Sequence, residues 1–208
     1  RQYDVLLCAD EVIGGFGRTG EWFAHQHFDF QPDTLTIAKG LTSGYIPMGG
    51  LVLSKRIASA LVDEGGVFAH GLTYSGHPVA AAVAIATLKA LRDEQIVTRV
   101  KTDTGPYLQA LLRETFSEHP LVGDIQGVGL VAALQFAEDK ASRKRFANEG
   151  DIAWRCRTLG FEEGLIIRST QGRMIMAPAL VASHAELDEL VDKTKRAVDR
   201  TAQELGLL

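Results

Sequence analysis

The fold of this chain is decided by VLLCADEVIGGFGRTG, residues 5–20. The stretch opens with five apolar residues, Val5 to Ala9, and such a continuous run is typical of a strand buried on both faces of a parallel sheet. The acidic pair Asp10 and Glu11 ends the run, and a glycine-rich loop follows. The stretch therefore predicts a charged pair at the carboxyl end of a buried strand.

A second stretch, TLTIAKGLTSGYIPMGG at residues 34–50, repeats this design with a lysine. Its first run, Thr34 to Ala38, predicts a strand that ends in Lys39. Ligands of open α/β sheets bind outside the carboxyl ends of the strands, so we expect Asp10 and Lys39 to share one site. Each residue alone also has an ordinary explanation, because an aspartate after a strand often forms a turn and a lysine there is usually solvated.

The rest of the chain alternates predicted strands and helices, which favours an α/β fold. The capping box Ser183-x-x-Glu186 marks the start of a last helix with apolar residues at helical spacing. We expect a parallel-sheet α/β domain over residues 1–95 and a smaller α+β domain over residues 96–208. The other expected elements are a strand at 49–54, helices at 56–62, 78–92 and 106–116, strands near 128–136, a helix at 150–159, and strands at 165–168 and 174–177.

Composition indicates a globular protein that binds small molecules. The 208 residues are 46% hydrophobic and 23% charged, with a formal net charge of -4, which gives no electrostatic reason to bind nucleic acid or an anionic membrane. Cys8 and Cys156 lie too far apart in sequence to indicate a disulfide framework or a cysteine metal site, so a cytoplasmic setting fits best. No apolar run approaches the ~18 to 20 residues of a membrane span. The abrupt start leads us to expect that an N-terminal portion is missing.

Residues 7–20 and 38–50 closely resemble the class III (omega) aminotransferases, and the 29-residue separation of Asp10 and Lys39 agrees with that family. The resemblance implies part of the large domain of a fold-type-I transferase, followed by its small C-terminal α+β domain, with pyridoxal 5'-phosphate as cofactor. Lys39 would be the catalytic Schiff-base lysine, since its amine can form an imine with an aldehyde. Asp10 would keep the ring nitrogen protonated, and Val12 would pack on the ring. A core valine is the alternative for Val12.

Two further site residues follow from the resemblance. The segment HGLTYSGHP, residues 70–78, is similar to the family segment whose threonine, here Thr73, binds the cofactor phosphate of the neighbouring subunit. The segment GLIIR, residues 164–168, resembles the strand that presents Arg168 to a substrate carboxylate, which a planar guanidinium binds through two parallel hydrogen bonds. The alternatives are a turn residue for Thr73 and a surface ion pair for Arg168.

The resemblance implies a transaminase that moves an amino group from an omega-amino acid or amine to a keto acid, with pyruvate as the expected acceptor. It also implies a homodimer with shared active sites. The family's N-terminal region has no counterpart in the chain, so we expect the carboxyl-terminal portion of such an enzyme. Two alternatives remain. One is another class III activity, such as decarboxylation, racemisation or aminomutation, and the other is a non-catalytic fragment of the fold.

Two other motifs point to different chemistry. GFGRTG, residues 15–20, matches the dinucleotide pattern G-x-G-x-x-G, but two acids separate the strand from the glycines and no clear helix follows. His25-x-His27 would place two imidazoles on one face of a strand as metal ligands, but no third ligand follows at a suitable spacing. We therefore expect neither a nicotinamide cofactor nor a metal.

Overall fold

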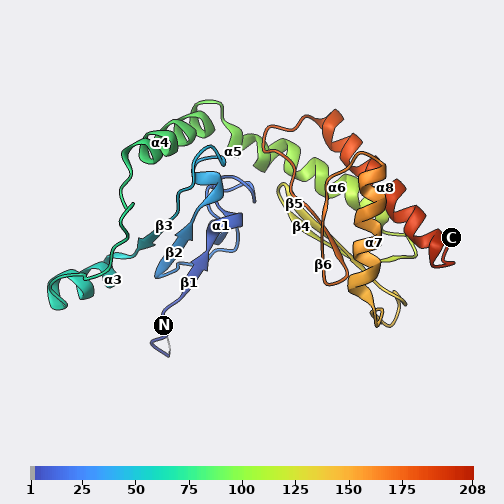
Figure 1. Ribbon diagram of the computed structural model, residues 1–208, viewed down its shortest axis with the longest axis horizontal. Coiled ribbons are helices and arrows are strands. Elements are labelled where there is room, and N and C mark those ends of the chain that lie inside the picture. The colour runs from blue at the N-terminus through green and yellow to red at the C-terminus, as the bar shows by residue number, and fades with distance from the viewer. Residues whose placement is uncertain (1–2) are drawn as a thin grey trace. The chain divides into compact units, whose positions relative to one another are not determined.

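The computed structural model describes residues 3–208, and the chain forms two compact units that divide between Thr98 and Arg99. The first unit contains a three-stranded sheet and the second a four-stranded sheet (Figure 1). The elements of the first unit are β1 (Cys8–Asp10), α1 (Glu11–Gly14), α2 (Ala24–His27), β2 (Thr34–Ile37), η1 (Lys39–Leu41), β3 (Gly50–Leu53), α3 (Lys55–Ser59), η2 (Ala60–Glu64) and α4 (Pro78–Asp93), and α5 (Ile96–Arg99) crosses the division.

The first sheet has the order β1-β2-β3, and only part of it is parallel. Strands β1 and β2 are parallel, as predicted, and their register places Asp10 beside Thr36. Strand β3 is antiparallel to β2, so the expectation of a wholly parallel sheet is wrong. Parallel neighbours need a crossover connection, usually a helix, whereas residues 38–49 contain only the single turn η1. The chain therefore reverses direction between β2 and β3.

Strand β1 is shorter and more open than its sequence predicts. It begins at Cys8, and Ala9 is its one buried residue. Val5, Leu6 and Leu7 are 69%, 55% and 47% exposed, so burial on both faces is not observed. A parallel strand is buried only where other elements cover both faces of its sheet, and no described element covers these side chains.

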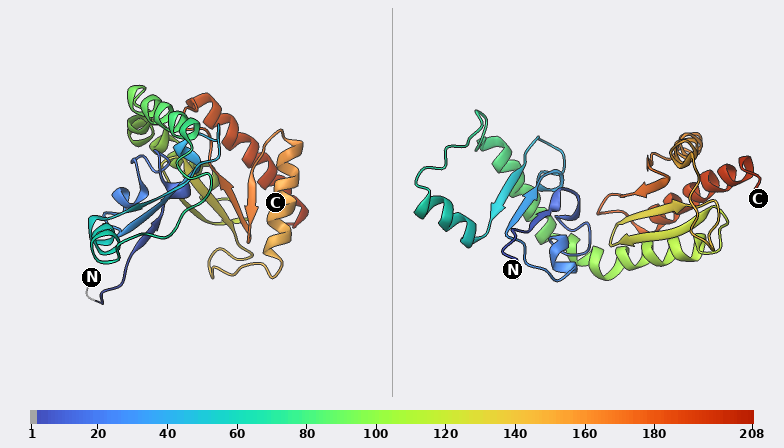
Figure 2. Two further views of the ribbon diagram at one scale, coloured as in Figure 1. Left: turned by 60° about the vertical axis from the view of Figure 1, so that its left-hand side comes forward. Right: turned by 90° about the horizontal axis from the view of Figure 1, so that it is seen from below.

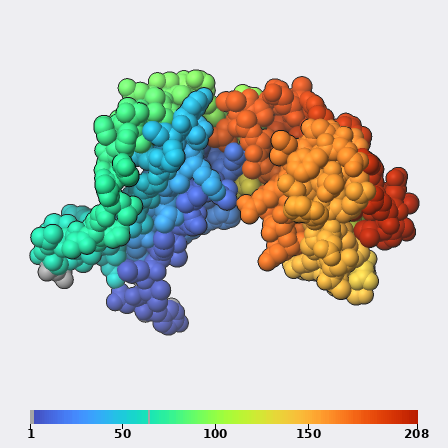
Figure 3. All heavy atoms as spheres, viewed as in Figure 1, coloured from blue at the N-terminus to red at the C-terminus, as the bar shows by residue number. Residues whose placement is uncertain are grey.

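Helix α4 closely matches its predicted range, because the sequence indicates both where the helix starts and which face is buried. Pro78 occupies the first turn, where a missing N–H costs nothing, and the His77 ring accepts a hydrogen bond from Ala80 N at 3.3 Å. Its buried residues recur along one face at Ala80, Ala84 and Leu91. The preceding residues, 65–77, contain no helix or strand and connect η2 to α4 as a long loop (Figure 3).

The second unit is an antiparallel sheet with helices packed against it. Its strand order is β4-β5-β7-β6, and every neighbouring pair is antiparallel. In the part of the chain that the structure describes, no helix has the length and apolar character needed to cross a membrane. The elements are η3 (Val100–Thr104), α6 (Gly105–Phe116), β4 (Val122–Val128), β5 (Val131–Phe136), α7 (Glu149–Glu162), β6 (Arg168–Thr170), β7 (Arg173–Met176) and α8 (His184–Glu204).

One face of this sheet forms the core and the other stays open. Helices α6, α7 and α8 contribute to a single buried cluster with strand residues such as Leu134, Phe136 and Met174 (Figure 2). Successive side chains of a strand point to opposite faces, so Gln135 and Arg173 lie on the face away from this cluster. Because Gln135 pairs with Arg173 across the strands, these two polar side chains are neighbours on the open face.

The last helix and the hairpin before it differ in how well the sequence predicts them. Ser183 and Glu186 form the expected capping box, since Ser183 Oγ accepts from Glu186 N and Glu186 Oε2 accepts from Ser183 N at 2.7 Å. The strand expected at 165–168 is displaced, because β6 begins at Arg168. Leu165 N donates a hydrogen bond to Gly160 O near the end of α7. The backbone at Leu165 therefore forms part of the helix terminus and does not pair with the sheet.

Leu134→Ala should lower the free energy of unfolding by about 2–5 kcal/mol, because it removes buried methyl groups and leaves a cavity. Urea denaturation of the full-length protein measures the change. The control is Ile166→Ala in the same unit, where the side chain is 89% exposed and the expected change is below about 0.5 kcal/mol. Equal losses in the two variants would contradict the assigned core face.

Candidate active site

The carboxyl ends of β1 and β2 bring the predicted pair to one edge of the first sheet. Asp10 is the last residue of β1, and its partner in the parallel register is Thr36 of β2. Lys39 follows Thr36 by three residues, two beyond the end of β2. Asp10 and Lys39 are both exposed. The sheet therefore presents a carboxylate and an amine from neighbouring strands, as the sequence predicts for one site.

Thr36 orients the Asp10 carboxylate. Its hydroxyl donates to Asp10 Oδ1 at 3.0 Å, and the backbone N–H of Val12 donates to the same oxygen at 3.1 Å. Neither bond involves Oδ2, and no described residue donates a hydrogen bond to it, so this oxygen is available to an external donor. Thr36 was not among the residues predicted from sequence, although a hydroxyl three residues before Lys39 in a predicted neighbouring strand was a signal that could have identified it.

The turn that carries Lys39 holds the backbone in an unusual conformation. Lys39 has φ +44°, in the left-handed region, which costs a non-glycine residue on the order of 1–3 kcal/mol. Leu41 N bonds to Ala38 O at 3.0 Å, and the buried Thr42 donates its hydroxyl to Ile46 O at 2.7 Å. These bonds hold the single turn η1 in place. Residues in such strained positions concentrate at functional sites.

The glycine-rich loop packs against this turn. Phe16 is buried, and a Cβ on Gly40 would approach its Cβ to 2.9 Å, so only glycine fits beside Lys39 without a shift. Phe16 N bonds to Trp22 O, and Gly17 N bonds to Glu21 O at 3.1 Å, which folds the loop back on itself. No helix opens within these glycines. The next helix, α2, begins only at Ala24 and has four residues, so the loop lacks the helix N-terminus that a dinucleotide pyrophosphate requires.

The adjacent acids Asp10 and Glu11 have different roles. Glu11 is 1% exposed, and its two carboxylate oxygens accept from the backbone N–H groups of Ala24 and His25, both at 2.8 Å. Glu11 therefore accepts the hydrogen bonds of backbone N–H groups in the first turn of α2, which have no partner within the helix. Val12 is half-buried and belongs to α1, the helix that follows β1 directly. The chain turns into a helix here because Asp10 caps it.

Thr73 lies apart from this group in the same unit. The turn around it is closed by Ser75 N bonding to Leu72 O at 2.9 Å, and Leu72 N bonds to Ser75 Oγ at 3.2 Å. The threonine is exposed, and its hydroxyl has no hydrogen-bond partner among the described residues. It lines a pocket of about 440 Å³ together with residues 47–49 and the residues that lead into α4. No described contact joins Thr73 to Asp10 or Lys39.

Arg168 belongs to the second unit, where it begins β6. It pairs with Ile175 and lies on the open face of that sheet. The side chain is exposed, and within residues 3–208 no carboxylate forms an ion pair with it, so the surface ion pair considered from sequence is not observed. Its guanidinium is free to bind a carboxylate from outside the chain.

The donor set of the first unit fits the cofactor that the resemblance implies. Pyridoxal 5'-phosphate needs an amine for its aldehyde and an anionic acceptor for its ring N–H. Lys39 Nζ and Asp10 Oδ2 are groups of these two kinds, at the ends of adjacent strands. Among the described residues no three His, Cys, Asp or Glu side chains are grouped so as to hold a metal ion. His25 and His27 lie on α2, and His25 Nδ1 is 3.0 Å from Phe30 O.

Comparison with known proteins identifies relatives of this chain. A family model described as Aminotransferase class-III matches residues 1–198. Putrescine–pyruvate aminotransferase of Pseudomonas aeruginosa is 50% identical over 201 residues, which are 97% of this chain and 43% of that protein. Diaminobutyrate–2-oxoglutarate transaminase of Halomonas elongata is 42% identical over 209 residues, 98% of this chain and 44% of that protein. The chain thus spans less than half the length of these relatives.

Solved structures show the same similarity. The omega transaminase from Pseudomonas jessenii in complex with PMP has a TM-score of 0.94 at 36% identity, covering 100% of this chain and 46% of that one. A transaminase from directed evolution by ancestral reconstruction has a TM-score of 0.93 at 45% identity, covering 98% of this chain and 45% of that one. The fold is that of the fold-type-I transaminases. Because the family model covers nearly the whole sequence, this chain belongs to the class III aminotransferases, a family that depends on pyridoxal 5'-phosphate.

Proposed function

We propose that the full-length protein containing this chain transfers an amino group from an amine or omega-amino acid to a keto acid, with pyruvate as the acceptor. The observation that carries the proposal is the anchored Asp10 carboxylate beside the strand that leads to Lys39. The names of the relatives support the reaction class, since they describe transaminases with putrescine, diaminobutyrate and pyruvate among their substrates.

Lys39, Asp10 and Val12 of the first unit would each have a defined task in this reaction. When bound, pyridoxal 5'-phosphate supplies a ring that accepts electrons from the substrate carbon. Lys39 Nζ would hold the cofactor through its aldehyde and, once displaced by the donor amine, would accept at Nζ the proton that the carbon bearing the amino group loses. Asp10 would keep the ring nitrogen protonated, because a nearby carboxylate favours the cationic ring. Val12 would supply an apolar contact to the ring.

Arg168 and Thr73 have proposed binding roles as well. The unpaired guanidinium of Arg168 is suited to the carboxylate of the keto acid, which it can bind through two parallel hydrogen bonds. Thr73 is assigned to the cofactor phosphate of a second subunit, so we propose a homodimer with shared sites. Its exposed, unpaired hydroxyl near the start of α4 supports this role.

The cysteines support a cytoplasmic location, which we propose for the protein. Cys8 and Cys156 are both free, and burial raises the pKa of the Cys156 thiol to about 11. A thiol with such a high pKa is neutral at physiological pH and unreactive, so Cys156 is a core residue and not a nucleophile.

Incubation of the full-length protein with a panel of amines and pyruvate should yield alanine. Chromatographic measurement of alanine with diamines, omega-amino acids and aryl amines identifies the donor class. A matched reaction with 2-oxoglutarate tests the acceptor. Racemisation or decarboxylation without any alanine would replace the transaminase assignment with another class III activity, and no turnover of any kind would favour the non-catalytic alternative.

Borohydride reduction of the cofactor-loaded protein should place a phosphopyridoxyl group on Lys39, because reduction traps the covalent link between amine and aldehyde. Peptide mass analysis locates the label. Lys55→Ala serves as a control, since this exposed lysine lies in the same unit at the start of α3 and its loss should leave labelling unchanged. A label on any lysine other than Lys39 would overturn the assignment.

Thr36→Val should lower kcat roughly tenfold or more, because it removes a hydrogen bond that positions the Asp10 carboxylate. KM for the keto acid should stay unchanged, since Thr36 contacts no group assigned to that substrate. Thr36→Ser, which keeps the hydroxyl, should restore most of kcat. Steady-state kinetics of the holoenzyme give both constants. Wild-type kcat in the valine variant, or failure of serine to rescue it, would remove the positioning role.

A further inference from the structure

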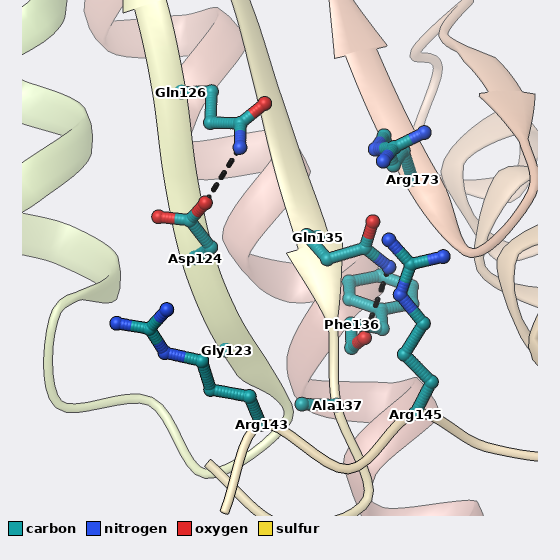
Figure 4. A pocket seen from close by; sticks show the side chains of 9 residues that line it. All are labelled: Gly123, Asp124, Gln126, Gln135, Phe136, Ala137, Arg143, Arg145 and Arg173. Carbon is teal, nitrogen blue, oxygen red and sulfur yellow. Dashed lines mark hydrogen bonds between the residues drawn. The ribbon is translucent and has the colours of Figure 1, made fainter. Parts of the chain in front are cut away.

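The open face of the second sheet carries a pocket with a marked positive charge. It has a volume of about 270 Å³, close to the lower end of the ~300–1,000 Å³ range of ligand pockets, which suits a small metabolite. Three arginines approach it from two directions (Figure 4). The polar residues that line it are Asp124, Gln126, Gln135, Arg143, Arg145 and Arg173.

Two of the arginines lack a partner that would neutralise them. Arg145 Nη1 lies 3.6 Å from Glu149 Oε1, whereas in the described chain no carboxylate forms an ion pair with Arg143 or Arg173. Asp124 is the one acid among the lining residues, and it forms no ion pair with them but accepts hydrogen bonds from Ile125 N at 2.9 Å and Gln126 Nε2 at 2.7 Å. The lining therefore carries positive charge in excess of its own acids.

Gln135 adds a fixed, unsatisfied acceptor to this pocket. The residue is 8% exposed, and its Nε2 donates to Phe136 O and Gly172 O, both at 3.1 Å. These two bonds set the direction of the amide, since a flipped amide would lose both. Its Oε1 is buried without a donor in the described structure. A buried carbonyl oxygen without a donor costs about 1–3 kcal/mol, so a ligand that supplies a hydroxyl gains at this position.

We propose that this pocket binds a small organic anion with two or more carboxylates and a hydroxyl group. Arg143 and Arg173 lie on different sides of the pocket and would each take a carboxylate, because guanidinium and carboxylate groups form two parallel hydrogen bonds (Figure 4). The hydroxyl would donate to Gln135 Oε1. Arg168 does not line the pocket, so the site does not depend on the proposed substrate role of that residue.

Citrate is the probe, because it has three carboxylates and one hydroxyl. Isothermal titration of the full-length protein should show one site in the second unit. Arg143→Gln and Arg173→Gln should each weaken binding roughly tenfold or more, since each removes a charge-assisted contact. Tricarballylate, which is citrate without its hydroxyl, should bind more weakly than citrate to the wild type.

The control is Arg155→Gln, which removes the same charge from the same unit at an exposed position on α7, where Arg155 pairs with Glu204. Its affinity for citrate should stay within about threefold of the wild type, as expected for a distant charge. The thermal midpoint of each variant without ligand checks that it is folded. Equal affinity in the wild type and Arg173→Gln, or tighter binding of pyrophosphate than of citrate, would overturn the proposal.

Discussion

The parallel pairing of β1 with β2 is the constraint on which the rest of the site depends. This pairing sets Asp10 beside Thr36, and the hydroxyl of Thr36 then holds one oxygen of the carboxylate. A shift of one residue in the register would send every side chain of a strand to the opposite face. The carboxylate and the strand that leads to Lys39 are therefore positioned by backbone hydrogen bonds of the sheet and not by the side chains alone.

The residues around this pair serve to hold it. Both carboxylate oxygens of Glu11, which is next in sequence to Asp10, accept hydrogen bonds from the backbone of α2. Of these two adjacent acids, only Asp10 therefore has a carboxylate oxygen available to a ligand. The glycine-rich loop packs Phe16 against Gly40 and so supports the strained turn at Lys39. Backbone strain at Lys39 persists only where neighbouring contacts outweigh its cost, and the buried Phe16 and Thr42 supply those contacts.

The second unit has one apolar face and one polar face on the same sheet. Its inner face is a continuous apolar cluster shared by three helices, whereas its outer face carries Arg168, Arg173 and Gln135. Strand alternation produces this division, because each strand sends every second side chain to the core. Polar groups on the outer face are thus held on rigid strands, which is a favourable way to present guanidinium groups to anions.

The sequence by itself determined the local features: the start of α8 by its capping box, the range of α4 by Pro78 and apolar spacing, and the positions of Asp10 at the end of β1 and of Lys39 just after β2. These follow from contacts between residues near in the chain. Tertiary structure alone decided the reversed direction of β3, the exposure of Val5 to Leu7, the displaced start of β6 and the roles of Thr36 and Glu11. It also gathered Arg143 with Arg173. These features depend on which distant segments pack together, and hydrophobic periodicity does not predict that packing.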